Sequence, residues 1–150
     1  MRAAWLATFA CVSAIAADPG AASRRSYVVE GDGIATSLTG RPGDPARGAQ
    51  LIQQRQKSLC VLCHAGPFPE PHLQGNIAPD LSGIGARLTP AQLRLRIVDM
   101  KHLNPHTIMP AYYAPVSDSA EVRVASQWRG KSILDAAEIE DLVAYLQTLR

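Results

Sequence analysis

The residues best suited to do chemistry in this 150-residue chain lie in one short run, Leu59-Cys60-Val61-Leu62-Cys63-His64. The pattern is C-x-x-C-H, the attachment signature of a c-type haem. Two thiols three positions apart can each add to one vinyl group of a haem, which gives two thioether bonds. The histidine that follows then lies over the ring, where an imidazole nitrogen can bind the iron as proximal ligand. The run therefore predicts one covalent haem c on Cys60 and Cys63, with His64 as an axial iron ligand.

Two other uses of a C-x-x-C pair fit the chain less well. A thioredoxin-like redox pair should sit in a βαβ context, and a zinc site needs two more ligands at close spacing. The chain has 3 Cys in all. The third, Cys11, lies in a segment that we expect to be removed. The chain therefore lacks the further ligands of a zinc site, and the pair does not lie in the βαβ context of a redox site.

Length and charge limit the function further. A chain of 150 residues suggests one compact domain. The net charge of +2 is small and no basic run is present, so the composition does not point to nucleic acid. Aromatic residues make up 5% of the chain. A haem would therefore add a large apolar surface to a core with few Phe and Trp.

Residues 1–16 have the features of an export signal. Met1-Arg2 is a short basic start, an uncharged apolar run follows, and Ala14-Ile15-Ala16 fits a small-x-small cleavage site. The run is too short for a membrane span, and an uncleaved N-terminal anchor is the alternative. We expect the mature protein to lie in the periplasm without being embedded in the membrane, which agrees with haem attachment outside the bacterial cytoplasm.

Residues 17–43 are rich in Gly, Pro, Ser and Thr, and contain one short β-like run, Tyr27-Val28-Val29. No helical period is present. The segment is either a loosely ordered tail, as is common at termini, or an arm that lies on a partner, and the residues alone favour the tail. The predicted organisation is a signal peptide over 1–16, an N-terminal arm over 17–43 and a helical haem domain over 44–150.

The first helix is expected to bring the chain to the haem motif. Asp44-Pro45 is an N-cap followed by Pro at the first helical position. The helix is predicted to run to about Lys57 and to lead directly into Cys60. Gly48 is a poor helix former within it, which indicates that another helix approaches closely there.

Two further helices begin at capping boxes, Thr89-Pro90-Ala91-Gln92 and Asp135-Ala136-Ala137-Glu138. In the first of them Arg94 is expected to point away from an apolar face made of Leu93, Ile97 and Met100. In the last helix the apolar residues at helical spacing are Ile139, Leu142, Val143 and Leu146. This face needs a partner, and we expect it to pack on the first helix at Gly48, behind the haem motif.

The segment from residue 65 to residue 85 is rich in Pro and Gly and predicts an irregular wrap on the histidine side of the haem. Pro79 can offer its carbonyl to the free ring nitrogen of His64, which would fix the tautomer and orientation of the imidazole. Leu81 would then pack on the haem. His72 lies in the same loop and is expected to be solvated.

Met109 is the predicted second axial ligand. It precedes a proline in a loop, where helix-face packing does not account for a methionine. It follows His64 by 109 − 64 = 45 residues, enough chain to cross the ring and return on its other face. A His/Met pair raises the potential of the haem and closes the iron, which disfavours a ligand-binding haem sensor. The alternative ligands are Met100, His102 and His106.

The order of these features resembles a class I cytochrome c, an all-α fold of helices around one covalently bound haem. More specific runs are similar to the SoxX family, the monohaem X subunit of the SoxAX thiosulfate-oxidising cytochrome complex of sulfur bacteria. The most specific runs lie at residues 37–48 and 103–113, and shorter ones lie at 74–76, 81–87 and 130–134. The resemblance covers about residues 27 to 149.

The resemblance implies a periplasmic heterodimer with a SoxA-type haem subunit, acting as an L-cysteine S-thiosulfotransferase. The pair joins thiosulfate oxidatively to a cysteine of a SoxYZ-type carrier. The X subunit has no catalytic residue of its own in this scheme; it takes electrons from the A subunit and passes them to a small cytochrome c. By motif match, Cys60 and Cys63 carry the haem, His64 is the proximal ligand and Met109 the distal one.

The resemblance also makes partner contact the favoured interpretation of the N-terminal arm. The alternative function is a free periplasmic electron-shuttle cytochrome c with no enzyme partner. Such a shuttle needs neither the arm nor the insert predicted over residues 112–131.

Overall fold

The computed structural model describes residues 27–113 and 131–150. The predicted signal peptide, its cleavage site, Cys11 and most of the insert after Tyr113 lie outside these residues. The elements are α1 (Pro45–Leu51), α2 (Cys60–Cys63), the 3-10 helix η1 (Pro71–Leu73), α3 (Ile84–Arg87), α4 (Pro90–Asp99), η2 (Met100–His102) and α5 (Ala136–Leu146). Every named element in the described ranges is helical, as predicted, and no helix among them is long and apolar enough to cross a membrane.

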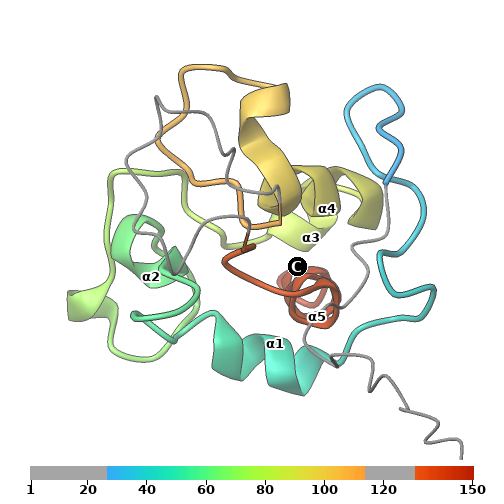
Figure 1. Ribbon diagram of the computed structural model, residues 1–150. Coiled ribbons are helices and arrows are strands. Elements are labelled where there is room, and N and C mark those ends of the chain that lie inside the picture. Colours follow the sequence, from blue (N-terminus) through green and yellow to red (C-terminus); the bar gives the residue numbers. More distant parts are fainter. Residues whose placement is uncertain (1–26, 114–130) are drawn as a thin grey trace, which may run out of the picture.

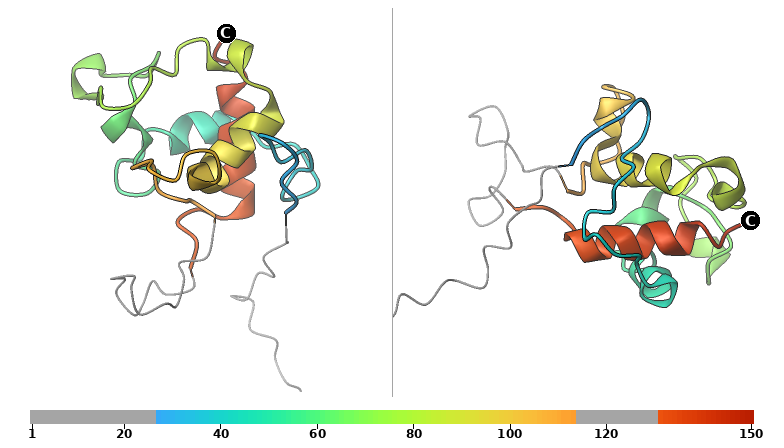
Figure 2. Two further views of the ribbon diagram at one scale, coloured as in Figure 1. Left: turned by 90° about the horizontal axis from the view of Figure 1, so that it is seen from above. Right: turned by 90° about the vertical axis from the view of Figure 1, so that its right-hand side faces the viewer.

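The C-terminal helix α5 lies at the centre of the fold, with α1 on one side and α4 on the other (Figure 1). Two further views show the elongated course of α5 between its neighbours (Figure 2). Both predicted capping boxes are present, at the starts of α4 and α5. The predicted apolar face of α5 is buried, while Met100, expected to extend the apolar face of α4, is only half-buried at its end.

Gly48 is the point where α1 crosses α5. A Cβ atom at this position would lie 2.1 Å from the carbonyl oxygen of Asp141 and 2.7 Å from the Cβ of Tyr145. No side chain fits at that distance, so the glycine allows the two backbones to touch. The prediction that Gly48 permits a close helix approach is confirmed.

The first helix ends earlier than predicted, at Leu51 and not near Lys57. Ser58 accounts for this difference. It is fully buried, and its hydroxyl donates to the carbonyl oxygens of Leu51 at 2.6 Å and Ile52 at 3.3 Å. The chain therefore folds back over the end of the helix, and Leu59, in a left-handed conformation, turns it into α2.

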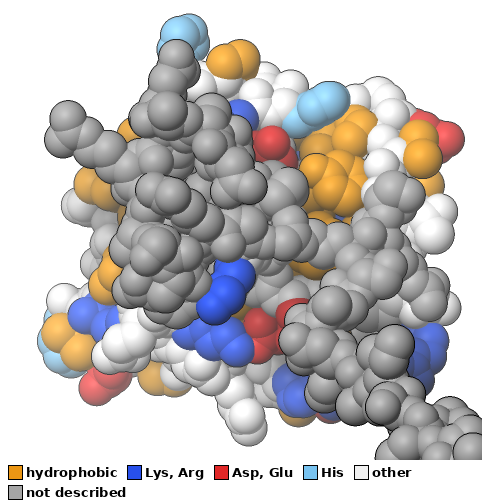
Figure 3. Space-filling view, in the orientation of Figure 1, with side chains coloured by type: hydrophobic (Ala, Val, Ile, Leu, Met, Phe, Trp, Pro, Cys, Tyr) orange, Lys and Arg blue, Asp and Glu red, His pale blue; other side chains and the backbone are white. Residues whose placement is uncertain are grey.

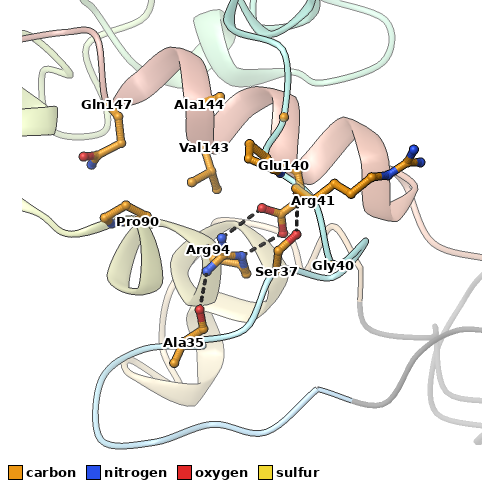
Figure 4. A pocket seen from close by; sticks show the side chains of 12 residues that line it. Ala35, Ser37, Gly40, Arg41, Pro90, Arg94, Glu140, Val143, Ala144 and Gln147 are labelled. Atoms are coloured by element: carbon orange, nitrogen blue, oxygen red, sulfur yellow. Dashed lines mark hydrogen bonds and ion pairs between the residues drawn. The ribbon is translucent and has the colours of Figure 1, made fainter.

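Arg94 does not point away from the core, and that prediction was wrong. The guanidinium is 5% exposed and pairs with Glu140 of α5 through two hydrogen bonds of 2.7 and 2.9 Å (Figure 4). A buried charge is tolerated only when it is paired in this way. The same ion pair holds the arm, because Arg94 also donates to the carbonyl of Ile34 at 2.6 Å and the amide of Leu38 donates to Glu140 at 2.9 Å.

The described part of the arm belongs to the core. Ile34 is 1% exposed and Leu38 is 4% exposed, and both join the same apolar cluster as α4 and α5. The short β-like run predicted at 27–29 forms no strand; the nearest feature is an isolated bridge between Glu30 and Gly33. From Ile34 onward the segment is therefore not a loose tail.

Replacing Gly48 by alanine is expected to lower the free energy of unfolding of the haem-bearing protein by about 2 kcal/mol, because the new Cβ overlaps the carbonyl of Asp141. Helix propensity alone predicts the opposite sign, a gain of about 1 kcal/mol. Urea unfolding measures the difference. Gln50→Ala, at an exposed position of the same helix, is the control and should change stability by less than about 0.5 kcal/mol. A Gly48→Ala variant more stable than the parent would contradict the close crossing.

Candidate haem site

The single turn of α2 presents the two cysteines. Cys60 and Cys63 are three residues apart, which places their side chains on one side of the turn. Both are half-buried free thiols and form no disulfide with each other. The turn thus offers two thiols on one face, which is the arrangement that two thioether bonds to one haem require.

The imidazole of His64 is held as predicted. Its Nδ1 atom lies 2.7 Å from the carbonyl oxygen of Pro79. A carbonyl oxygen only accepts, so Nδ1 is the donor in this contact, and in the neutral imidazole Nε2 is then the unprotonated nitrogen. That tautomer presents a lone pair to a metal, and the backbone contact fixes the direction of the ring.

The proline-rich loop is fastened to the cysteine turn by its backbone. The amides of Gly75, Ala78 and Leu81 donate to carbonyls within residues 61–65 at 2.9, 3.0 and 2.9 Å. A Cβ atom at Gly75 would lie 2.0 Å from the carbonyl oxygen of Leu62, so the loop can approach this closely only with a glycine there. The loop therefore has one position relative to the two cysteines and His64.

The segment that follows Pro79 is closed by a turn of its own. The carboxylate of Asp80 accepts a hydrogen bond of 2.6 Å from the amide of Ser82, and hydrogen bonding by Ser82 lowers the pKa of Asp80. Arg87 donates to the carbonyls of Ser82 at 2.6 Å and Asp80 at 3.1 Å. Leu81 is half-buried and packs on the core between these contacts, so both Pro79 and Leu81 are held in place.

Met109, the predicted second axial ligand, is half-buried and packs against the core. Its amide donates to the hydroxyl of Thr107 at 3.2 Å. The alternative ligands differ from it in their surroundings: Met100 is half-buried at the end of α4, and His102 and His106 are exposed. His72 in η1 is exposed too, as expected.

The electrostatics of Cys60 disagree with a redox role. Burial raises the pKa of its thiol, whereas redox-active C-x-x-C pairs depend on a lowered pKa. Within the described part of the chain, no group of three or more His, Cys, Asp and Glu residues could hold a metal ion by itself. The donor set of two thiols and one oriented imidazole fits a haem c, in which the ring supplies the remaining donors to the iron.

Tyr112 and Ser58 lie next to the cysteine turn, and the sequence analysis did not identify either of them as part of the site. Tyr112 is 3% exposed, and its hydroxyl donates to the carbonyl of the buried Ser58. Burial raises the pKa of Tyr112, so the phenol keeps its proton as a donor. The only sequence signal was that Tyr112 closely follows the Met109-Pro110 pair.

Comparison with known proteins agrees with this site. A family model described as Cytochrome c matches residues 45–150. Among solved structures the chain is similar to the crystal structure of SoxXA from P. pantotrophus, at 37% sequence identity and a TM-score of 0.71. That match covers 82% of this chain and 93% of the other. No curated protein sequence matches the chain.

Replacing Cys60 or Cys63 by serine is expected to remove one thioether bond and to prevent accumulation of stable haem-bearing protein, since the haem supplies much of the buried apolar surface. Haem staining after denaturing electrophoresis measures covalent attachment, and a thermal melt measures folding. Leu62→Ala is the matched control, because Leu62 lies between the cysteines and is 43% exposed. A cooperative melt in a haem-free double cysteine variant would contradict the expected dependence.

Proposed function

The chain belongs to the cytochrome c family, as a SoxX-like electron-transfer cytochrome with covalently bound haem c, and we propose that it is the electron-accepting subunit of a periplasmic thiosulfate-oxidising complex. In this proposal a SoxA-type haem subunit gives up electrons while thiosulfate is joined to a cysteine of a SoxYZ-type carrier. This chain accepts the electrons and passes them to a small cytochrome c. The observation that carries the proposal is the similarity to SoxXA over nearly the whole length of the matched chain.

The proposed axial ligands are His64 and Met109, with Cys60 and Cys63 as the attachment points. The Pro79 carbonyl supports the assignment of His64, since it holds the proton on Nδ1 and leaves Nε2 for the iron. The packing of Met109 against the core supports it over the exposed histidines of the same region. When bound, the haem supplies the one-electron chemistry; the chain's residues hold, orient and shield it.

The cysteines of the chain indicate which steps of the proposed reaction it can carry out. Once both motif cysteines are thioethers, and Cys11 has left with the signal peptide, the mature chain has no thiol. It then has no thiolate to attack or carry sulfur. The sulfur chemistry must therefore take place on partner proteins, and this chain contributes electron transfer alone.

Exposed apolar side chains support contact with a redox partner. Each segment that would enclose the haem exposes one of them: Leu62 on the cysteine turn is 43% exposed, Ile77 on the proline loop 67%, and Ile108 beside Met109 76%. On the face drawn in Figure 3, hydrophobic side chains lie among both positive and negative ones. Apolar contact without a strong field of one sign suits brief docking between redox proteins.

Replacing Met109 by alanine is expected to abolish the sulfur-to-iron charge-transfer band of the oxidised protein, because the thioether that produces it is gone. Absorbance spectroscopy of the ferric protein at the red end of the visible range measures the band. Met100→Ala is the matched control and should keep it. The opposite pattern, with the band lost in Met100→Ala and kept in Met109→Ala, would assign the ligand to Met100.

The purified chain alone is expected to show no thiosulfate-dependent reduction, and reduction should appear when a SoxA-type subunit and the carrier protein are added. The rate of haem reduction after thiosulfate addition is the measurement, with an unrelated small cytochrome c in place of this chain as control. Rapid reduction of the chain alone would overturn the subunit assignment. Equal rates with this chain and with the control cytochrome would favour the free shuttle.

A further inference from the structure

We propose that Tyr112 is a positioning residue for the distal iron ligand: its hydroxyl anchors the Met109 loop to the turn that carries the haem-attachment cysteines. The inference rests on the proposed assignment of Met109 as the sixth ligand. It adds a residue that the C-x-x-C-H motif and the methionine loop do not identify.

Tyr112 is fixed at both its backbone and its side chain. Its amide donates to the carbonyl of Ile97 in α4 at 3.3 Å, and its carbonyl accepts from the amide of Leu134 at 3.0 Å. Its hydroxyl donates to the carbonyl of Ser58. One residue thus connects α4, through its backbone, with the entry to the cysteine turn, through its side chain.

Ser58, whose carbonyl accepts this hydrogen bond, is itself buried and hydrogen-bonded. Ser58 is 0% exposed, and its own hydroxyl donates to the carbonyl of Leu51 at 2.6 Å, at the end of α1. Through Ser58, the Tyr112 hydroxyl is therefore connected to the end of α1. A donor removed here would leave a buried carbonyl with one partner fewer, which costs more than the bond itself is worth.

Haem attachment removes one of the two hydrogen-bond donors to the carbonyl of Ser58 and leaves Tyr112. As a thiol, Cys60 also points its sulfur at the Ser58 carbonyl, at 3.4 Å. A thioether has no proton to donate. In the haem-bearing protein the contribution of the thiol is lost, and the Tyr112 hydroxyl remains as the donor at the carbonyl of Ser58.

The anchor lies close enough to Met109 to control its position. Only Pro110 and Ala111 separate the two residues, so three residue steps span at most about 10 Å. The ring of Pro110 fixes one of the intervening backbone angles, which makes the link stiff. The hydrogen bond that Met109 makes through its own amide goes to Thr107 in the same loop, and it cannot by itself tie the loop to the other side of the haem.

The test is displacement of the distal ligand by imidazole in the oxidised, haem-bearing protein. Imidazole must compete with Met109 for the iron, so its apparent Kd reports how firmly the methionine is held. Tyr112→Phe removes only the anchoring oxygen and should lower the apparent Kd about tenfold, the equivalent of one hydrogen bond of ordinary net strength. A merely stabilising tyrosine would lower the melting temperature without changing this affinity.

Tyr113→Phe is the matched control. Tyr113 is also buried, at 6% exposed, and its amide likewise donates to α4, at the carbonyl of Val98. Its ring packs near Tyr27, away from the Ser58 carbonyl in its described contacts. The apparent Kd of imidazole should stay within about twofold of the parent value, since no anchoring bond is lost.

Pro110→Gly provides a second variant that leaves the buried hydroxyl in place and loosens the link to Met109. It too should tighten imidazole binding several-fold. An unchanged apparent Kd in either Tyr112→Phe or Pro110→Gly would overturn the inference, as would an equal change in Tyr113→Phe.

Met109→Ala separates this result from failure of the ligand assignment. With no methionine to displace, it should bind imidazole most tightly of all the variants. If it does so while Tyr112→Phe matches the parent, Met109 is the ligand and Tyr112 is not its anchor. If Met109→Ala itself matches the parent, the ligand assignment fails and the inference fails with it.

Discussion

Two neighbouring carboxylates on α5 hold the rest of the structure together. Glu140 pairs with Arg94 of α4 and accepts from the arm at Leu38, and all of these groups are buried. Asp141 faces α1: it accepts from the amide of Asp44 at 2.6 Å and from the Arg47 guanidinium at 2.7 Å. Successive helical residues point in different directions, so one helix can bind two layers through adjacent side chains. Removing the Glu140 carboxylate would leave the buried Arg94 unpaired, which is costly. The guanidinium that pairs with Asp141 is exposed, so its loss would cost less.

This arrangement fixes the two sides of the haem site from one helix. α1 packs against α5 at Gly48. Ser58 hydrogen-bonds to the end of α1, and the cysteine turn follows Ser58 in the chain. α4 is set against α5 through Arg94, and it receives the backbone of Tyr112 beyond the Met109 loop. The cysteine turn and the Met109 loop are thus positioned by opposite neighbours of α5. The hydrogen bond from the hydroxyl of Tyr112 to the carbonyl of Ser58 then links these two parts of the site directly.

The features visible in the sequence were those with a local cause. The C-x-x-C-H turn and the two capping boxes follow from residues a few positions apart, and the close approach at Gly48 follows from one glycine. The Pro79 contact to His64 spans 15 residues of one loop. The errors came from contacts that a helix makes with residues outside it. Arg94 is buried because Glu140 lies opposite it in the fold, and α1 ends at Leu51 because Ser58 folds back upon it. A helical period does not reveal either contact, since it describes one element and not its neighbours.

The hydrogen bonds that hold the site end mostly on backbone groups, and this has a consequence for electron transfer. His64 is oriented by a carbonyl, the proline loop by three amides, and the turn after Pro79 by Asp80 and Arg87. Of the side chains in these contacts only Arg87 is long, and it donates to backbone carbonyls. Groups that are already in place need not rearrange when charge arrives or leaves, which is the advantage of a preorganised site. For a proposed electron carrier, rigidity around the ligands serves the function, while the exposed apolar residues nearby remain free to meet different partners.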